Sequence, residues 1–72
     1  MRLTVELDRE ADGRWIASVP ELRGVHVYAA TRDAALTKAL ALSYGVLADE
    51  IEHGEQDAQT LMNLVFETHE AA

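Results

Sequence analysis

The sequence contains no cysteine and a single proline, Pro20, and basic residues are scarce. Without cysteine, the chain has neither disulfide bonds nor a thiolate zinc site to compensate for a small hydrophobic core. A chain of 72 residues buries only about 60% of the surface that it exposes when unfolded, so the core is expected to be thin. Self-association is the remaining general remedy, and we expect a homo-oligomer, either a dimer or a tetramer.

Long apolar stretches are also absent. No run approaches the roughly 18 residues that span a bilayer, and the N-terminus is charged from Arg2 onward, unlike a signal peptide. Hydrophobic residues make up 49% of the chain and charged residues 26%, which is the composition of a folded domain. We therefore expect one domain over residues 1–72, in the cytoplasm.

The charge of the chain is unbalanced. Six Lys and Arg residues against thirteen Asp and Glu give a net charge of −7, the wrong sign for a domain that grips nucleic-acid phosphates. An acidic domain suits a basic protein partner, because complementary charge speeds encounter and disfavours wrong partners. The alternative is that the charge only maintains solubility.

The first part of the chain predicts a β-hairpin. Apolar and polar residues alternate along residues 2–8, which is typical of a half-buried strand with Leu3, Val5 and Leu7 on its buried face. The dipeptide at residues 12–13, Asp-Gly, favours a turn because its glycine accepts positive φ angles.

Two more strands follow this turn. Residues 14–19 predict the second strand, with Trp15 as a large anchor for the core. Pro20 ends it, because proline has no amide hydrogen for a sheet. Residues 25–28 are rich in residues that favour strands and predict a third antiparallel strand.

A long helix is predicted over residues 32–53. Thr31 is suited to cap its N-terminus, and Asp33 places negative charge in the first turn, where the helix dipole is positive. Gly54 is expected just past the C-terminus, in the left-handed conformation. The apolar positions recur at three- and four-residue steps and form one broad stripe: Ala35, Leu36, Ala39, Leu40, Leu42, Val46, Leu47 and Ile51.

Residues 60–67 alternate again and predict a fourth strand, so the expected fold is α+β: a three-stranded antiparallel meander, one long helix and a last strand. Leu61 and Val65 would lie on the strand face directed away from the helix, and we predict that they form an oligomer interface. The alternative is that they are isolated apolar surface residues, which are common. Residues 68–72 have little apolar content and are expected to fray.

Side chains with catalytic potential are scattered. The three histidines have no metal-binding spacing, and no serine or glycine lies in a nucleophile or phosphate-binding motif. We therefore predict no metal site, no cofactor and no catalytic residue. One alternative is a metal-dependent nuclease, which needs at least three converging oxygen donors for Mg²⁺. Its candidate carboxylates are Glu6 or Asp8 together with Glu50, Glu52 and Glu67.

The chain resembles the HicB-like antitoxin family over roughly residues 2–66. The features that carry the resemblance occur in the family's order. They are the acidic turn before Trp15, the strand W-I-A-S-V-P, the E-L-x-G that follows, the helix start T-R-D-A-A-L and the helix end I-E-H-G. The sequence departs from the family at Arg23, Ala29 and Ala34, where proline, glycine and an acidic residue are common.

The resemblance implies a degenerate RNase H-like fold that acts by binding and not by catalysis. The usual partner is a HicA-type toxin, a small basic mRNA interferase whose RNA-binding surface and catalytic histidine the antitoxin covers. Family members commonly carry a C-terminal DNA-binding domain, and because the sequence ends at Ala72 we expect no such domain and no operator binding.

Clustered negative charge suggests where a basic partner would bind. We predict partner contacts at Glu6, Asp8, Glu10 and Asp12 around the first hairpin and at Glu21 in the next loop. A second reading keeps the family resemblance without a toxin: a stand-alone homo-oligomeric module that acts in regulation or binds a small ligand.

Overall fold

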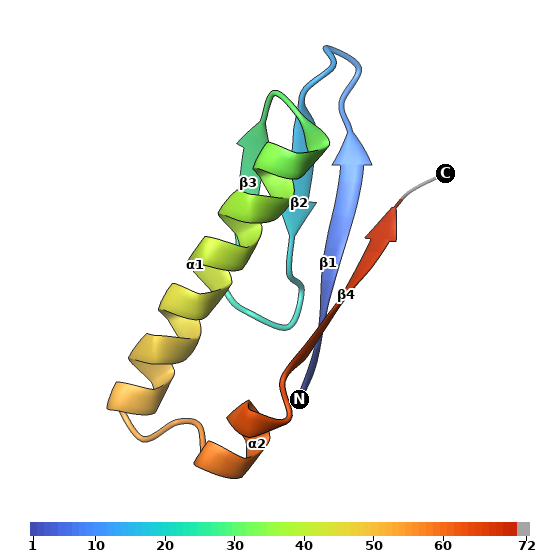
Figure 1. Ribbon diagram of the computed structural model, residues 1–72. Coiled ribbons are helices and arrows are strands. Elements are labelled where there is room, and N and C mark those ends of the chain that lie inside the picture. The colour runs from blue at the N-terminus through green and yellow to red at the C-terminus, as the bar shows by residue number, and fades with distance from the viewer. Residues whose placement is uncertain (71–72) are drawn as a thin grey trace.

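The computed structural model describes residues 1–70 and confirms the α+β class (Figure 1). Four strands and one long helix account for most of the chain, and a short second helix joins them. The elements are β1 (Arg2–Arg9), β2 (Trp15–Ser18), β3 (His26–Ala29), α1 (Arg32–Glu52), α2 (Ala58–Met62) and β4 (Val65–Glu70).

The four strands form one mixed sheet in the order β3-β2-β1-β4. The pairs β1–β2 and β2–β3 are antiparallel, whereas β4 lies parallel to β1. The chain therefore leaves the sheet at one edge, after β3, and returns at the opposite edge through α1 and α2 (Figure 1). Parallel strands need a long crossover connection of this kind, and the helix supplies it.

The turns lie where the sequence predicts them. Gly13 adopts a φ of +91° between β1 and β2, and Glu10 N–H donates to Arg14 O at 2.7 Å to close the hairpin. After Pro20 the chain folds back so that Val19 N–H donates to Val25 O at 3.0 Å. Leu22, inside this connection, is buried in the core.

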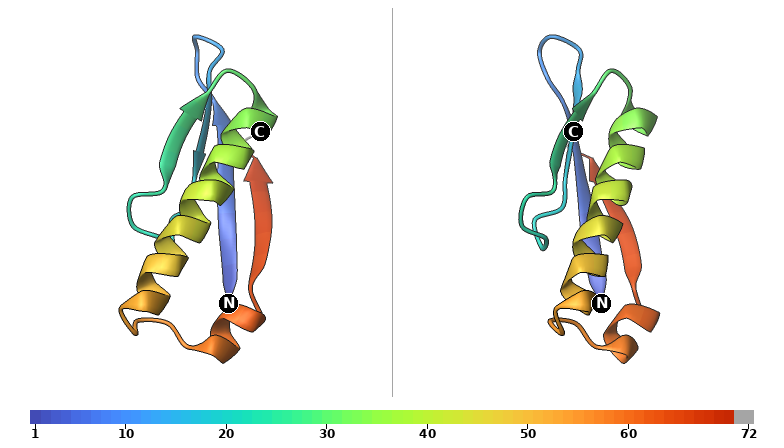
Figure 2. Two further views of the ribbon diagram at one scale, coloured as in Figure 1. Left: turned by 60° about the vertical axis from the view of Figure 1, so that its left-hand side comes forward. Right: turned by 90° about the vertical axis from the view of Figure 1, so that its left-hand side faces the viewer.

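The core lies between α1 and one face of the sheet (Figure 2). Strand alternation places Leu3, Val5 and Leu7 on this face, as predicted. From α1 the small side chains Ala35 and Ala39 are completely buried, which lets the helix approach the strands closely. The molecule is elongated, with extents of 40 × 19 × 16 Å, so the core is thin.

Helix α1 agrees with its predicted bounds and caps. Thr31 Oγ1 accepts a hydrogen bond from Ala34 N–H at 3.1 Å, and Gly54 has a φ of +71° just past the helix. The predicted apolar stripe is too broad, however, because Leu42 is 39% exposed and Ile51 51% exposed. The sheet covers only a narrow band of the helix, and Ser43 lies fully buried in that band.

The fourth strand begins later than predicted. Residues 58–62 form α2, which Asp57 caps by accepting a hydrogen bond from Thr60 N–H at 2.8 Å. Leu61 in α2 and Leu64 in the turn after it both pack against the core, and Leu64 N–H donates to Leu61 O at 3.2 Å. A short alternating pattern does not exclude this arrangement. Strand β4 starts only where Val65 N–H donates to Met1 O at 2.8 Å.

The prediction that the tail frays is wrong for residues 68–70. Thr68, His69 and Glu70 continue β4 and lie beside residues 5–7 of β1. Backbone hydrogen bonding along a strand does not require apolar side chains, which is why composition misled the prediction. Residues 71–72 lie outside the described part of the chain. Among residues 1–70, no helix combines the length and apolar character that crossing a membrane requires.

Candidate functional site

The face of the sheet opposite α1 is the candidate site, since no element of residues 1–70 covers it (Figure 2). Alternation along β1 turns Glu6 and Asp8 onto this face, while Leu7 points into the core. The strand register sets Glu6 beside Ser18 on β2 and His69 on β4, and Ser18 beside His26 on β3. Residues distant in the sequence thus form one polar row across all four strands.

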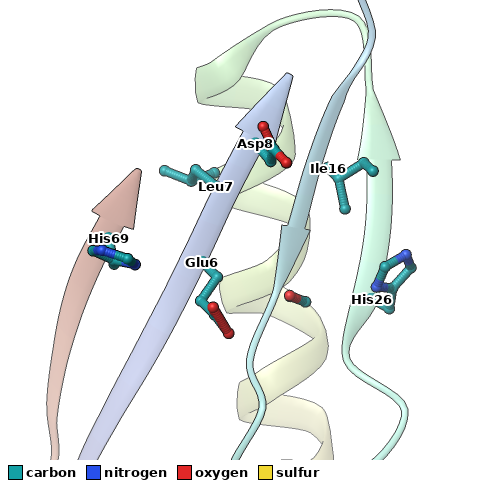
Figure 3. Close-up of a pocket in the computed structure, with 7 residues that line it drawn as sticks. Glu6, Leu7, Asp8, Ile16, His26 and His69 are labelled. Carbon is teal, nitrogen blue, oxygen red and sulfur yellow. The ribbon is translucent and has the colours of Figure 1, made fainter. Parts of the chain in front are cut away.

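A shallow hollow of about 300 Å³ lies in this face around Glu6 and Asp8 (Figure 3). His69 stands on one side of these two carboxylates and His26 on the other. Asp8 Oδ1 accepts a hydrogen bond from Arg9 N–H at 2.8 Å. Within residues 1–70, the Glu6 carboxylate has neither a hydrogen bond nor an ion pair, so it is free to bind a cationic group.

His26, which lines the hollow, contacts an aromatic ring on β3, and that ring carries a cationic side chain from the segment before β2. The ring of Tyr28 lies 5.4 Å from that of His26 in an edge-on arrangement, and the Arg14 guanidinium stands 4.8 Å above the Tyr28 ring centroid. Sequence reasoning did not assign these residues to a site. The alternation of residues 25–28 carries the signal, because it places His26 and Tyr28 on the face opposite Val27.

The predicted contact Asp12 lies in the hairpin turn and is already engaged. Its Oδ1 accepts from Arg14 N–H at 3.0 Å, and its Oδ2 accepts from Arg14 Nε at 2.8 Å. The backbone hydrogen bond from Arg14, together with the guanidinium, holds the pKa of Asp12 below its ordinary value despite some desolvation. Glu10 lies at the same turn, where Arg14 pairs with Asp12 and offsets its charge.

The predicted contact Glu21 lies in the loop after β2 and serves the backbone. Its carboxylate oxygens accept from Thr4 N–H at 3.1 and 3.2 Å, beyond the last paired residues of β1 and β2. Desolvation alone would raise the pKa of Glu21, but the hydrogen bonds from Thr4 and from its own amide outweigh that effect and lower it. Glu21 is therefore a structural carboxylate as well as a surface charge.

The carboxylates that a nuclease would need do not come together. Glu50 and Glu52 lie at the end of α1, in the other layer from Glu6, and Glu50 Oε2 accepts from Gln56 Nε2 at 3.1 Å. Glu67 lies on β4 and pairs with Arg2 at 3.5 Å. Across residues 1–70, no group of three or more His, Asp or Glu side chains is arranged to hold a metal ion.

Leu61 and Val65 do not share the strand face on which they were predicted to form an interface. Leu61 belongs to α2 and is partly buried against the core, because residues 58–62 are helical. Val65 opens β4 and is 50% exposed. The predicted placement of the pair is wrong, and whether either residue contacts another subunit stays a prediction.

A second hollow, of about 280 Å³ and mainly apolar, lies between the C-terminal half of α1, α2 and the segment before β4. Its exposed side chains include Tyr44 and Ile51. The residues that line it are Tyr44, Leu47, Ala48, Ile51, Leu61 and Leu64.

Comparison of the chain with models of known protein families, with curated proteins and with solved structures found no match. The HicB-like resemblance therefore rests on the sequence motifs alone.

Proposed function

We propose that this protein is an antitoxin-like binding module that neutralises a basic HicA-type mRNA interferase by covering its RNA-binding surface. The observation that carries the proposal is the pair of accessible carboxylates, Glu6 and Asp8, on a sheet face that no other element of residues 1–70 covers. A partner that binds RNA presents basic side chains for phosphate, and a carboxylate-lined hollow complements the same side chains.

The electrostatics and the chain order support this proposal in two further ways. The net charge of −7 attracts a basic partner over distances comparable with the Debye length. The order β1-β2-β3-α1-β4, with β4 parallel to β1, is compatible with the degenerate RNase H-like fold that the resemblance implies. As proposed, the protein acts by occlusion and performs no chemistry, and the complex forms in the cytoplasm.

The test is co-expression with the neighbouring open reading frame. We expect growth arrest caused by the neighbour to be relieved and a stable complex to be recovered. A neighbour that is not toxic and does not bind would overturn the proposal.

A variant pair tests whether the hollow is the binding surface. Glu6→Gln with Asp8→Asn removes two charges without changing size, and we expect the complex to weaken by about tenfold or more. The matched control is Glu52→Gln with Glu55→Gln, which removes two exposed charges near the far end of α1. Equal loss of affinity in both double variants would mean that only net charge matters.

The stand-alone homo-oligomeric module is the second candidate. The apolar hollow between α1 and α2, with exposed Tyr44 and Ile51, favours it because a monomer rarely leaves such residues grouped on its surface. The absence of a neighbouring gene for a short basic protein would favour this candidate over the antitoxin.

A further inference from the structure

Strand β4 is an edge strand whose outward backbone groups have no partner within residues 1–70. Val65 N–H donates to Met1 O at 2.8 Å and so faces β1. Since the direction of backbone groups alternates along a strand, Glu67 and His69 also face β1. Phe66, Thr68 and Glu70 therefore direct their N–H and C=O groups toward the free edge.

The opposite edge of the sheet is better protected. On β3, Lys38 Nζ donates to Tyr28 O at 3.2 Å and occupies a backbone acceptor. Strand β4 has no lysine and no proline, the residues that commonly blunt an edge, and in the described chain no side chain bonds the backbone of Phe66, Thr68 or Glu70. Of the two edges, β4 is thus the one prepared for strand addition.

Helix α1 does not run over β4. It packs on β1, β2 and β3 and reaches β4 through two side chains. Tyr44 lies with its ring 5.5 Å from that of Phe66, and Arg32 Nε donates to Glu70 Oε1 at 2.6 Å. Figure 1 and the left view of Figure 2 show β4 at the side of β1 that lies away from α1. Another strand can therefore reach the edge without displacing α1.

We propose that a second copy of this chain adds to this edge, with the two β4 strands antiparallel and related by a two-fold axis at Thr68. In this register Thr68 pairs with Thr68 of the second copy, and Phe66 pairs with Glu70. Every free-edge N–H and C=O of these three residues gains a partner, because antiparallel residues of this kind exchange both hydrogen bonds. The two sheets join into one continuous sheet, and the interface is isologous, since both copies contribute the same surface.

The side chains favour this register over its neighbours. Glu67 of each copy lies opposite His69 of the other, an acidic residue against a basic one, and Thr68 meets Thr68; both kinds of cross-strand pair are stabilising. Moving the axis to Glu67 sets Glu67 against Glu67, which is destabilising, and leaves Glu70 without a partner in β4. Moving it to His69 sets His69 against His69 and removes the Glu67–His69 pairs. Because β4 is complementary to a second antiparallel β4 in these side-chain pairs, we infer that the strand added at this edge comes from a second copy of the chain.

This interface does not depend on the proposed toxin-binding function. Addition at the β4 edge extends the sheet sideways and leaves the hollow around Glu6 and Asp8 on an open face. The dimer and the toxin complex can accordingly be tested, and can fail, separately.

The first test is Thr68→Pro, measured by sedimentation velocity over a concentration series with circular dichroism on the same samples. Proline is tolerated on an edge strand where the N–H faces solvent, so the monomer fold is retained while the two central hydrogen bonds of the interface are lost. We expect a wild-type dimer, a monomeric Thr68→Pro variant and a dimeric Thr68→Val control. A wild-type protein that stays monomeric, or a Thr68→Pro variant that dimerises, overturns the proposal.

A charge exchange tests the register. His69→Glu sets two glutamates opposite each other, and we expect the dimer Kd to rise by about tenfold. Adding Glu67→Lys restores an attractive pair and should return the Kd to within about threefold of wild type. The control Arg2→Ala removes the Arg2–Glu67 ion pair within one chain and should leave the Kd unchanged. A double variant no tighter than His69→Glu would contradict this register.

Discussion

At the scale of single residues, the stability of this protein depends on the side chains that enlarge a thin core. Trp15 is the largest of them, and it pairs with Ala29 across β2 and β3. It packs against the core cluster, as the sequence predicts for a large anchor, but it is only partly buried. Its contribution is therefore smaller than that of a fully buried aromatic residue.

We expect Trp15→Ala to lower the free energy of unfolding by about 2 kcal/mol, below the ~3–5 kcal/mol typical of a fully buried aromatic side chain. Chemical denaturation followed by circular dichroism measures this loss. Tyr28→Ala, on the open face of the sheet, is the comparison and should cost less, since Tyr28 is 41% exposed. An unchanged denaturation midpoint for Trp15→Ala would show that its ring contributes nothing to the core.

The hairpin carboxylate Asp12 predicts a pH dependence. Its folded pKa is lowered by the hydrogen bond from Arg14 N–H and by the Arg14 guanidinium. A lowered folded pKa means that the stabilisation is fully present above the unfolded pKa, near 3.9, and is lost as the pH falls through the folded value. NMR titration should place the Asp12 midpoint below the ordinary pKa of an aspartate side chain. In Arg14→Ala the midpoint should move upward, and a midpoint that stays fixed would contradict the assignment.

At the scale of elements, the ends of α1 depend on neighbouring residues in the sequence, whereas the choice of its buried side chains depends on the sheet. The cap at Thr31 and the left-handed Gly54 follow from the sequence because each satisfies backbone groups of its own neighbours. The sheet determines which side chains of α1 are buried, because only those that contact the strands are covered. Ser43 is buried there because its hydroxyl donates to Ala39 O at 2.7 Å within the helix, so it does not leave an unsatisfied polar group.

The N-cap prediction is tested by Thr31→Ala. Loss of the hydroxyl that accepts from Ala34 N–H should reduce the free energy of unfolding by about 1 kcal/mol. Thr37→Ala, the same change at an exposed position inside α1, should be neutral or slightly stabilising, because alanine is the better helix former. Equal effects of the two variants, measured by thermal denaturation, would argue against a capping role.

At the scale of the whole molecule, the acidic charge and the position of the helix on one face of the sheet together determine which charges are accessible. The acidic residues outnumber the basic ones, and the helix is confined to one face of the sheet (Figure 2). The uncovered face therefore carries carboxylates that a partner can reach, while β4 at the margin offers backbone groups to a second strand. The two proposals therefore use separate surfaces: the basic partner is proposed to bind the face of the sheet, and the second copy its β4 edge.

If the proposed partner is basic, its association rate will depend on ionic strength. Raising the salt concentration from about 0.05 M to about 0.5 M shortens the Debye length and should slow association by about tenfold or more, with a smaller effect on dissociation. Surface plasmon resonance at several salt concentrations measures both rates. A rate of association that does not change with salt would show that the charge maintains solubility only.

Residues 58–70 differ most from the structure that the sequence predicts. The alternating pattern predicted a strand at Leu61. In the structure Asp57 caps a short helix there, and Leu61 packs against the core from that helix. The polar residues Thr68, His69 and Glu70 looked unable to order themselves, yet their backbone pairs with β1. For the candidate site, Glu6 and Asp8 were predicted as contacts, whereas the placement of His26 and His69 on either side of these carboxylates depends on the strand register.

By itself the sequence determined what depends on near neighbours: the hairpin turn at Gly13, the end of β2 at Pro20, the caps of α1, the buried face of β1 and the acidic charge. Tertiary structure decided the contacts between residues far apart in the sequence, because the register of strand pairing sets which residues lie side by side. It set β4 parallel to β1, gathered Glu6, His26 and His69 on one face, and left Phe66, Thr68 and Glu70 at a free edge.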